Sequence, residues 1–361
     1  MKAAFYNPAI SFEENYEKGP LCNFENISLP KRKITKTEKF LGFDVNTPFG
    51  IPSGPIPNST FVQAAFAFGF DIVTYKTVRA SAFPCHPFPN VIFVNAPAQL
   101  HPEQTPKLIG KRETDAPIEM LSITNSFGVP SKDPAIWQED VKKAMGYAGT
   151  GQLFILSFMG TVRENQTQEE FITDFVKAAK LSYETGAKVL EANLSCPNIG
   201  DEGLVCYNTD VTREVVKRIR AVIGDTPLVL KVGYYKNDSD LEKIAEIAAE
   251  YSNAIAIINS LPVEVVDETG KQALPGKNRL KSGICGACVK WAGIEMVEKL
   301  HKIRKDKSLN YEILGIGGVM TTNDYMDYRN AGADAVQSAT GAMWNAYLAH
   351  EIWKKTHEKR A

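Results

Sequence analysis

Cysteine is scarce in this sequence and follows no regular spacing. The cysteines of the 361 residues are Cys22, Cys85, Cys196, Cys206, Cys285 and Cys288. Disulfide-rich folds carry more cysteines in shorter chains, so we expect no disulfide framework. An excess of charge is missing too, because the formal net charge is −1. A chain so nearly neutral is not expected to bind nucleic acid or other polyanions.

Long apolar runs are also absent. No run approaches the ~20 residues that a helix needs to span a bilayer. The N-terminal segment carries Glu13, Glu14 and Glu17 where a signal peptide would have its apolar stretch. We therefore expect a cytoplasmic protein that binds neither membrane nor nucleic acid.

The chain is nevertheless long and apolar enough for a large domain. Apolar residues make up 44% of it, and 361 residues suit one α/β barrel with extensions, although length alone also allows two domains. Residues 1–40 lack clear periodicity and contain Pro8, Pro20 and Pro30. We expect an irregular N-terminal arm, bounded at residues 1–44, and one catalytic barrel domain at 45–361.

Short apolar runs predict the strands of this domain. The runs are 49–54, 71–77, 153–160, 188–195, 227–233, 254–260, 311–318 and 334–340. Segments between them, such as 171–187 and 240–252, have helical spacing, and this alternation is typical of parallel α/β folds. An open sheet remains an alternative. A (β/α)8 TIM barrel is favoured, because the runs number eight and nearly all end in polar residues or glycine, which a barrel gathers at one mouth.

One segment breaks the alternation. Residues 78–118 contain seven prolines, which predict a long loop excursion over the barrel mouth. Long loops in compact domains are often functional, but a plain surface insertion is an equal alternative.

The strongest chemical motif is Asn193-Leu-Ser-Cys-Pro-Asn198, directly after an apolar run. Carboxamides supply both donors and acceptors, which suits a planar ligand with alternating carbonyl and N–H groups. The thiol of Cys196, with an ordinary pKa near ~8.5, can serve as a base more readily than a serine. A buried, inert cysteine in a turn is the alternative, and the flanking asparagines favour function.

This hexapeptide resembles the active-site loop of the class 1 dihydroorotate dehydrogenases. The related dihydropyrimidine dehydrogenases typically have histidine where this chain has Asn198, and the quinone-linked class 2 enzymes have serine in place of Cys196. The resemblance covers residues 45–350, with further motifs in the same order. It implies an FMN enzyme that oxidises dihydroorotate to orotate in pyrimidine biosynthesis. Cys196 would remove the C5 proton while hydride passes from C6 to flavin N5.

The resemblance also implies site residues. For the substrate they are Lys76, Asn125, Phe127, Gly128, Val129, Asn193, Asn198, Asn259 and Ser260. For FMN they are Ser53, Gly54, Lys76, Thr77, Asn125, Asn193, Lys231, Gly286, Gly317, Gly318, Ala339 and Thr340. Lys231 would stabilise negative charge near N1 of the reduced flavin. Gly317-Gly318 and Ala339-Thr340 would form the barrel phosphate site, and Ala339 stands where the family has glycine.

The remaining cysteine motifs predict little. Cys285-Gly-Ala-Cys288 is a CxxC without the second pair or the histidines that would complete a zinc site, so we expect a structural turn and no metal. Cys85-His86 is expected to be incidental.

Partners and alternatives stay open at this point. A dihydropyrimidine oxidoreductase and a non-catalytic flavin-binding barrel are the alternative functions. The electron acceptor could be fumarate, with a homodimeric enzyme, or NAD, through a partner subunit bearing FAD and an iron–sulfur cluster. A homodimer is the expected assembly.

Overall fold

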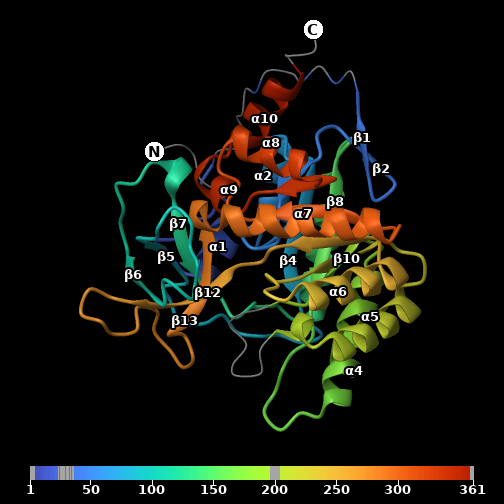
Figure 1. Ribbon diagram of the computed structural model, residues 1–361, viewed down its shortest axis with the longest axis horizontal. Coiled ribbons are helices and arrows are strands. Elements are labelled where there is room, and N and C mark those ends of the chain that lie inside the picture. Colours follow the sequence, from blue (N-terminus) through green and yellow to red (C-terminus); the bar gives the residue numbers. More distant parts are fainter. Residues whose placement is uncertain are drawn as a thin grey trace.

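The computed structural model describes residues 5–22, 24, 29, 32, 34, 36–195 and 204–357. Eight parallel strands close into a barrel in the order β10-β11-β14-β15-β3-β4-β8-β9 (Figure 1). They are β3 (Phe49–Ile51), β4 (Ile72–Val78), β8 (Leu153–Phe158), β9 (Leu190–Asn193), β10 (Leu228–Lys231), β11 (Ala254–Ile257), β14 (Glu312–Ile316) and β15 (Ala335–Gln337). Each lies within one of the predicted apolar runs, except that β4 extends one residue beyond its run, to Val78. The (β/α)8 barrel is therefore confirmed.

The barrel strands are apolar throughout because both of their faces are buried. Ile72, Ile155, Val229 and Leu314, from four different strands, pack in one cluster inside the barrel. The opposite strand faces contact the surrounding helices. Burial on both sides removes the polar alternation of a surface strand, which is why these segments read as continuous apolar runs.

Helices surround this barrel and include both predicted ones. They are α2 (Ser59–Ala67), α3 (Pro134–Met145), α4 (Gln168–Tyr183), α5 (Thr209–Ile223), α6 (Asp238–Tyr251), α7 (Lys290–Asp306), α8 (Thr322–Ala331) and α10 (Leu348–His357). Helices α4, α5 and α6 pack side by side, at the lower right of Figure 1. A capping box between Thr167 and Glu170 starts α4, which satisfies backbone donors at that helix end.

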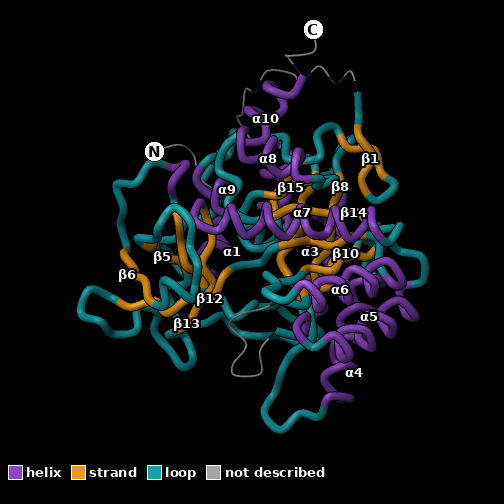
Figure 2. The backbone as a smooth tube through the Cα atoms, viewed as in Figure 1, coloured by secondary structure: helices purple, strands orange, loops and turns teal. Residues whose placement is uncertain are grey.

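A second group of strands stands beside the barrel. In Figure 2 most of it lies to the left. Its members are β5 (Val91–Val94), β6 (Lys107–Lys111), β7 (Ser122–Asn125), β12 (Leu261–Val266) and β13 (Lys281–Gly286), which close in the order β12-β13-β7-β5-β6. The excursion at 78–118 is therefore not loop throughout, since it contributes β5 and β6. Strand β6 pairs with β12, which lies more than a hundred residues away, and a local sequence pattern cannot reveal such a partner.

The N-terminal arm contains short regular elements. Helix α1 (Phe12–Lys18) starts at a capping box between Ser11 and Glu14, and β1 (Glu38–Phe40) pairs with β2 (Phe43–Val45) in a hairpin. The helix buries Phe12 against the domain. The expected irregular arm thus holds one helix of two turns, which its proline spacing did not predict.

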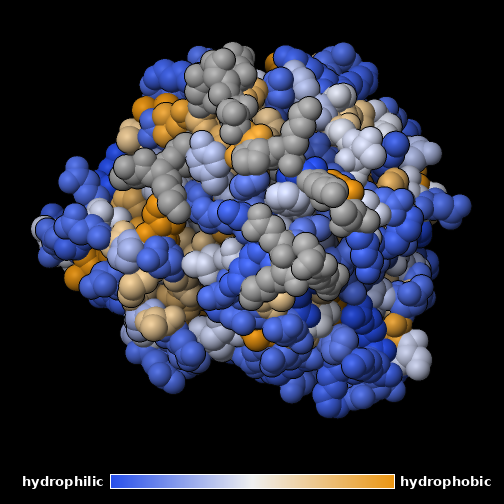
Figure 3. All heavy atoms as spheres, turned by 90° about the horizontal axis from the view of Figure 1, so that it is seen from above, coloured by the Kyte–Doolittle hydropathy of each residue, from blue (hydrophilic) through white to orange (hydrophobic). Residues whose placement is uncertain are grey.

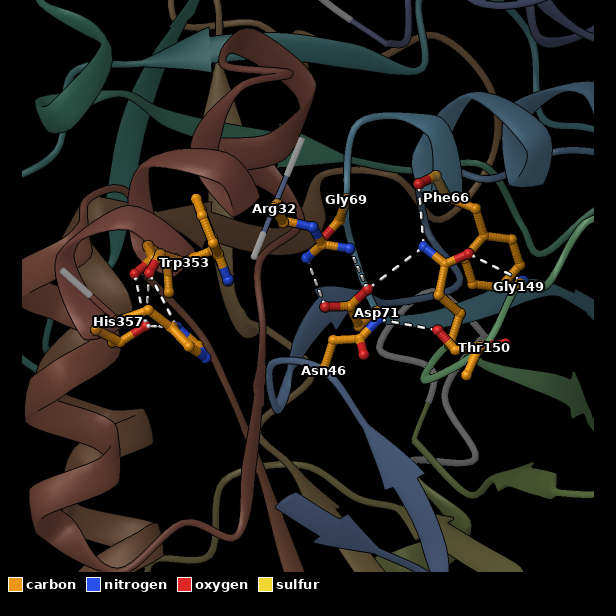
Figure 4. A network of polar contacts seen from close by, with 12 residues as sticks. Arg32, Asn46, Phe66, Gly69, Asp71, Gly149, Thr150, Trp353 and His357 are labelled. Carbon is orange, nitrogen blue, oxygen red and sulfur yellow. Dashed lines mark hydrogen bonds and ion pairs between the residues drawn. The ribbon is translucent and has the colours of Figure 1, made fainter. Parts of the chain in front are cut away.

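A buried ion pair ties this arm to the barrel. Figure 4 shows the Arg32 guanidinium against the carboxylate of Asp71, at the start of β4, with N–O distances of 2.7 and 2.8 Å. The Asp71 side chain has no exposed surface. Gln152 adds a hydrogen bond of 3.3 Å to the same carboxylate. Burial raises the pKa of Asp71, and the charge and hydrogen bonds of Arg32 oppose that rise.

The surface is mostly hydrophilic on the face drawn in Figure 3, where apolar residues form small groups. Among the described helices, none is both long and apolar enough to cross a membrane. Within the same residues, no group of three or more histidine, cysteine or acidic side chains could hold a metal ion.

Candidate active site

The carboxyl ends of several barrel strands meet at a cavity of about 70 Å³. The lining residues are Ser53, Gly54, Lys76, Thr77, Asn125, Phe127, Gly128, Val129, Asn193, Ser195, Lys231, Asn259 and Ser260. All but Ser195 are residues predicted for substrate or cofactor. They come from strand ends scattered over some two hundred residues, and the barrel closure brings together all but the four at 125–129, which follow β7 of the second strand group.

A second cavity of about 80 Å³ shares several of these walls. Gly54, Asn125, Phe127, Lys231 and Asn259 line both cavities. Only the second reaches the predicted phosphate residues, Ala339 and Thr340, together with apolar side chains and Tyr6. The two cavities therefore form one adjoining site, with the predicted substrate residues at one end and the predicted phosphate residues at the other.

Hydroxyl and amide groups fix the floor of the first cavity. The Thr77 hydroxyl lies 3.3 Å from that of Ser53 and 2.9 Å from that of Ser157. Asn193 donates from Nδ2 to the same Thr77 oxygen at 3.4 Å. Asn259 donates to the carbonyl of Ser195. These buried contacts hold both carboxamides in fixed orientations, as a ligand with a set pattern of donors and acceptors requires.

Two buried lysines supply the positive charge of the site. Lys76 and Lys231 expose only 7% and 6% of their surface. The Lys76 ammonium lies 5.0 Å from the ring centre of Phe127, close enough for a cation–π contact. Lys231 has no salt bridge to any of the residues that the structure describes. A cation buried in this way calls for negative charge from a ligand.

The loop after β7 is held from behind by Arg79. This arginine is buried and donates to the carbonyls of Val129 at 2.9 Å and Gly128 at 3.1 Å. Gly128 and Val129 have φ of 73° and 53°, a conformation that a valine adopts only when its surroundings impose it. The arginine therefore sets the shape of the predicted substrate loop.

A second buried arginine holds the start of that loop. Arg279 donates to the Ser126 carbonyl at 2.8 Å and to the Ser126 hydroxyl at 3.1 Å. It also donates to the carbonyls of Pro87 and Pro89, at 2.7 and 2.9 Å. It thus joins the excursion to the loop. Sequence reasoning missed both arginines, because nothing in the local sequence separates a buried arginine from a surface one.

The cysteine motifs are closer to the site than the sequence suggested. The Cys285 sulfur accepts a hydrogen bond of 3.1 Å from Asn125 and lines the second cavity. Burial raises its pKa to about 12, so the thiol stays protonated. His86 also contacts the loop, since its backbone N–H donates to the Phe127 carbonyl at 3.0 Å. The histidine of the Cys85-His86 pair therefore adjoins the predicted substrate loop through its backbone.

Three glycines predicted for cofactor binding occupy positions where a larger side chain would be strained or would clash. Gly317 and Gly318 have φ of 125° and 67°, and a Cβ on Gly318 would lie 2.6 Å from Lys290. A Cβ on Gly286 would lie 2.2 Å from the carbonyl oxygen of Leu121. None of the three glycines lines either cavity. They let the segments that carry the site approach one another closely.

Two predicted residues, Cys196 and Asn198, lie outside the described residues. The segments on either side of them are described. Ser195 lines the first cavity, and the Cys206 N–H donates to the Leu194 carbonyl at 3.0 Å. Both ends of the predicted catalytic loop are therefore fixed beside the cavity.

Several polar atoms in these walls have no protein partner. The hydroxyls of Tyr6, Ser195 and Thr340 are buried and form no close hydrogen bond within the described part of the chain, although Asn15 lies beside the first and Cys206 beside the second. Buried polar groups are nearly always paired, so these three hydroxyls fit a polar ligand in the site. Together with the buried cation, they suit a bound cofactor that carries oxygen atoms and negative charge.

Comparison with known proteins gives a consistent result. A family model described as dihydroorotate dehydrogenase matches residues 113–359. The chain is similar to a dihydroorotate dehydrogenase of Dictyostelium discoideum, with 34% identity over 95% of each chain. It is also similar to the catalytic subunits named dihydroorotate dehydrogenase B (NAD(+)) of Petrotoga mobilis and Bacteroides thetaiotaomicron. The Petrotoga subunit is 28% identical over 56% of this chain and 64% of its own length. The Bacteroides subunit is 31% identical over 47% of this chain and 54% of its own length.

Proposed function

Because this chain belongs to the dihydroorotate dehydrogenase family of oxidoreductases, we propose that it oxidises (S)-dihydroorotate to orotate in de novo pyrimidine biosynthesis, with FMN as its cofactor. The observation that carries the cofactor is Lys231. It is a buried lysine at a barrel strand end, without a salt bridge in the described chain. It would stabilise the negative charge of a reduced flavin.

The chain's other residues divide between cofactor and substrate. Ser53, Gly54 and Thr77, with Ala339 and Thr340, would hold FMN. Gly286, Gly317 and Gly318 would shape the walls beside it. When bound, the flavin supplies N5 as acceptor of the hydride that leaves C6 of the substrate.

The substrate would be held by amides. Asn125, Asn193, Asn198 and Asn259 would bind the carbonyl and N–H edges of the ring, helped by Ser260. Lys76, with the backbone of Phe127, Gly128 and Val129, would bind beside them. Cys196 would take the C5 proton, since a thiol is a usable base near neutral pH.

A dihydropyrimidine oxidoreductase is the second candidate, because its ring presents the same amide pattern. Dihydroorotate differs by its carboxylate. The buried Lys76 ammonium beside the substrate loop favours an anionic ligand, and so dihydroorotate.

We also propose the wider setting of this activity. The arm at 1–44 would be an extension of a catalytic domain at 45–361, in a cytoplasmic homodimer. Some relatives are named as NAD(+)-type catalytic subunits, which favours testing NAD through an FAD and iron–sulfur partner subunit as well as fumarate.

Flavin analysis and substrate reduction test the proposal together. The flavin released by denaturation is identified by absorbance and mass, and FMN is expected. The holoenzyme is then mixed anaerobically with dihydroorotate or dihydrouracil. Bleaching of the flavin by dihydroorotate alone supports the proposal, whereas FAD, no flavin, or reduction only by dihydrouracil contradicts it. Reoxidation by fumarate, quinone or NAD identifies the acceptor.

A further inference from the structure

The N-terminal arm reaches the cavity that holds the predicted cofactor residues. Tyr6 lines this cavity beside Gly54, Thr340 and Met343. It does not line the cavity of Lys76, Asn193 and Ser260, where the predicted substrate residues gather. None of the motifs in the barrel signals this residue, because it precedes the first barrel strand by more than forty positions.

The position of Tyr6 is fixed on two sides. The N–H of its neighbour Phe5 donates to the Met343 carbonyl at 3.1 Å, which pins the arm to α9 (Thr340–Trp344). The Tyr6 ring meets that of Phe127 edge to face, with 5.6 Å between centroids. The side chain therefore bridges the segment after β15 and the loop after β7.

The hydroxyl group of Tyr6 is buried, and its proton has no acceptor among the described residues. Tyr6 exposes 2% of its surface, and its hydroxyl donates no hydrogen bond within the described residues, although the Asn15 side chain lies beside it. The amide group of the nearby Asn15 is already engaged, donating to the Asn7 and Ser11 carbonyls and accepting from the Asn7 N–H. Burial raises the pKa of Tyr6, so the group is an O–H donor at neutral pH.

Such a group is costly unless a ligand uses it. A phenol could be replaced by phenylalanine here with the ring packing kept, and the unpaired buried hydroxyl would disappear. Among the buried hydroxyls of the cavity walls, that of Thr340 is unpaired in the same way. Two unpaired hydroxyls on one cavity indicate that both face the same ligand.

We propose that Tyr6 is a cofactor-binding residue, whose hydroxyl donates a hydrogen bond to an oxygen of the flavin. This inference rests on the proposed function and extends it, because it makes the N-terminal arm part of the binding site. The arm supplies a wall and a donor that the barrel alone lacks.

Binding of FMN to the apoprotein, followed by quenching of flavin fluorescence, tests the proposal. Tyr6→Phe should raise the Kd for FMN about three- to tenfold, the usual effect of losing one hydrogen bond. The melting temperature of the apoprotein should hold or rise, because no protein bond is lost. Tyr311→Phe is the matched control, since its buried hydroxyl donates to the Leu300 carbonyl at 2.8 Å. It should lower the melting temperature and leave the FMN affinity unchanged.

The possible results distinguish a failure of the role proposed for Tyr6 from a failure of the proposed function. An unchanged FMN affinity in Tyr6→Phe overturns the inference while the wild type still binds FMN and reacts. A loss of orotate affinity alone, measured through the flavin spectrum, also overturns it, because the hydroxyl would then serve the substrate. Failure of the wild-type apoprotein to bind FMN would remove the proposed function itself.

Discussion

At the scale of single residues, the site depends on charged groups placed where water is excluded. Lys231 sits at the end of β10 with its ammonium in the cavity and no acidic partner in the described chain. Its charge is then available to a ligand. An interaction that strengthens as negative charge develops accelerates the step in which that charge appears.

Replacing Lys231 with alanine should therefore slow flavin reduction more than it weakens orotate binding. A reduction rate lower by roughly 10²–10³-fold is expected, as when one donor to a developing anion is removed. The midpoint potential of the flavin should also fall. Lys188→Ala is the control, because that exposed lysine precedes β9 at the opposite end of the barrel. An unchanged potential in Lys231→Ala would remove the lysine from this role.

Cys196→Ala should keep FMN and still bind orotate, because the amide and flavin contacts remain. Its rate of flavin reduction by dihydroorotate should fall by ~10²–10⁴-fold, the usual contribution of a general base. Cys196→Ser should keep part of the activity, with a rate profile shifted to higher pH, since a hydroxyl is the weaker acid. Stopped-flow reduction measures both variants. A wild-type rate in Cys196→Ala would end the assignment.

The sequence predicted the residues that face the cavity better than those behind them. Asn125, Asn193 and Lys231 stand at strand ends in recognisable motifs. Arg79 and Arg279 lie in no motif, and only the folded chain shows that each gathers carbonyls of the substrate loop. Supporting contacts of this kind join segments far apart in sequence, so a local pattern cannot contain them.

At the scale of elements, the barrel strands could be predicted from local sequence, whereas the strands of the second group depend on distant partners. The eight barrel strands were predicted because each is a buried apolar run that alternates with a helix. Strands β5 and β6 were missed because they are short, lie among prolines, and find partners in β7 and β12. Arg279 donates both to the excursion, at Pro87 and Pro89, and to the loop that faces the cavity, at Ser126. These hydrogen bonds hold the loop against the excursion.

Arg279→Lys should loosen this bridge, because a lysine cannot reach the same set of carbonyls. The free energy of unfolding should fall by about 2–3 kcal/mol, the loss of a charged hydrogen-bonded group. The Kd for orotate should rise while the FMN affinity changes little. Arg213→Lys, a half-exposed arginine paired with Glu250, should change stability by less than about 1 kcal/mol. Equal effects of the two variants on orotate binding would contradict the bridging role.

At the scale of the whole molecule, the arm runs from one end of the barrel to the other. Tyr6 lies at the mouth, and Arg32 pairs with Asp71 at the amino end of β4. Forming this ion pair adds little net stability, because burying two charges offsets their attraction. Breaking it by removing one partner is costly, because Asp71 is fully buried. Losing the arginine would leave that carboxylate without a counter-charge.

Arg32→Ala should lower the free energy of unfolding by about 3 kcal/mol at neutral pH. Without Arg32, only the hydrogen bonds of Gln152 and Asn46 oppose the effect of burial, so the pKa of Asp71 rises further in the folded state, while the unfolded chain titrates near 3.8. Above that pH the unfolded state loses a proton that the folded state retains, so stability falls as the pH rises.

The deficit of the variant should therefore be larger at pH 7 than at about pH 4, as denaturant titrations at both values can show. Adding Asp71→Asn to Arg32→Ala should restore part of the stability and abolish the pH dependence. A deficit independent of pH would place the cause elsewhere.

The bond between Phe5 and Met343 also bears on the order in which the protein is completed during synthesis. The arm leaves the ribosome before the barrel strands, whereas its partners at the loop after β7 and on α9 leave later, α9 after the last barrel strand. The segment around Phe5 and Tyr6 therefore cannot reach its final position until the eight barrel strands have been made. The pocket around Tyr6 consequently forms late in the synthesis of the barrel, because it needs both the arm and α9.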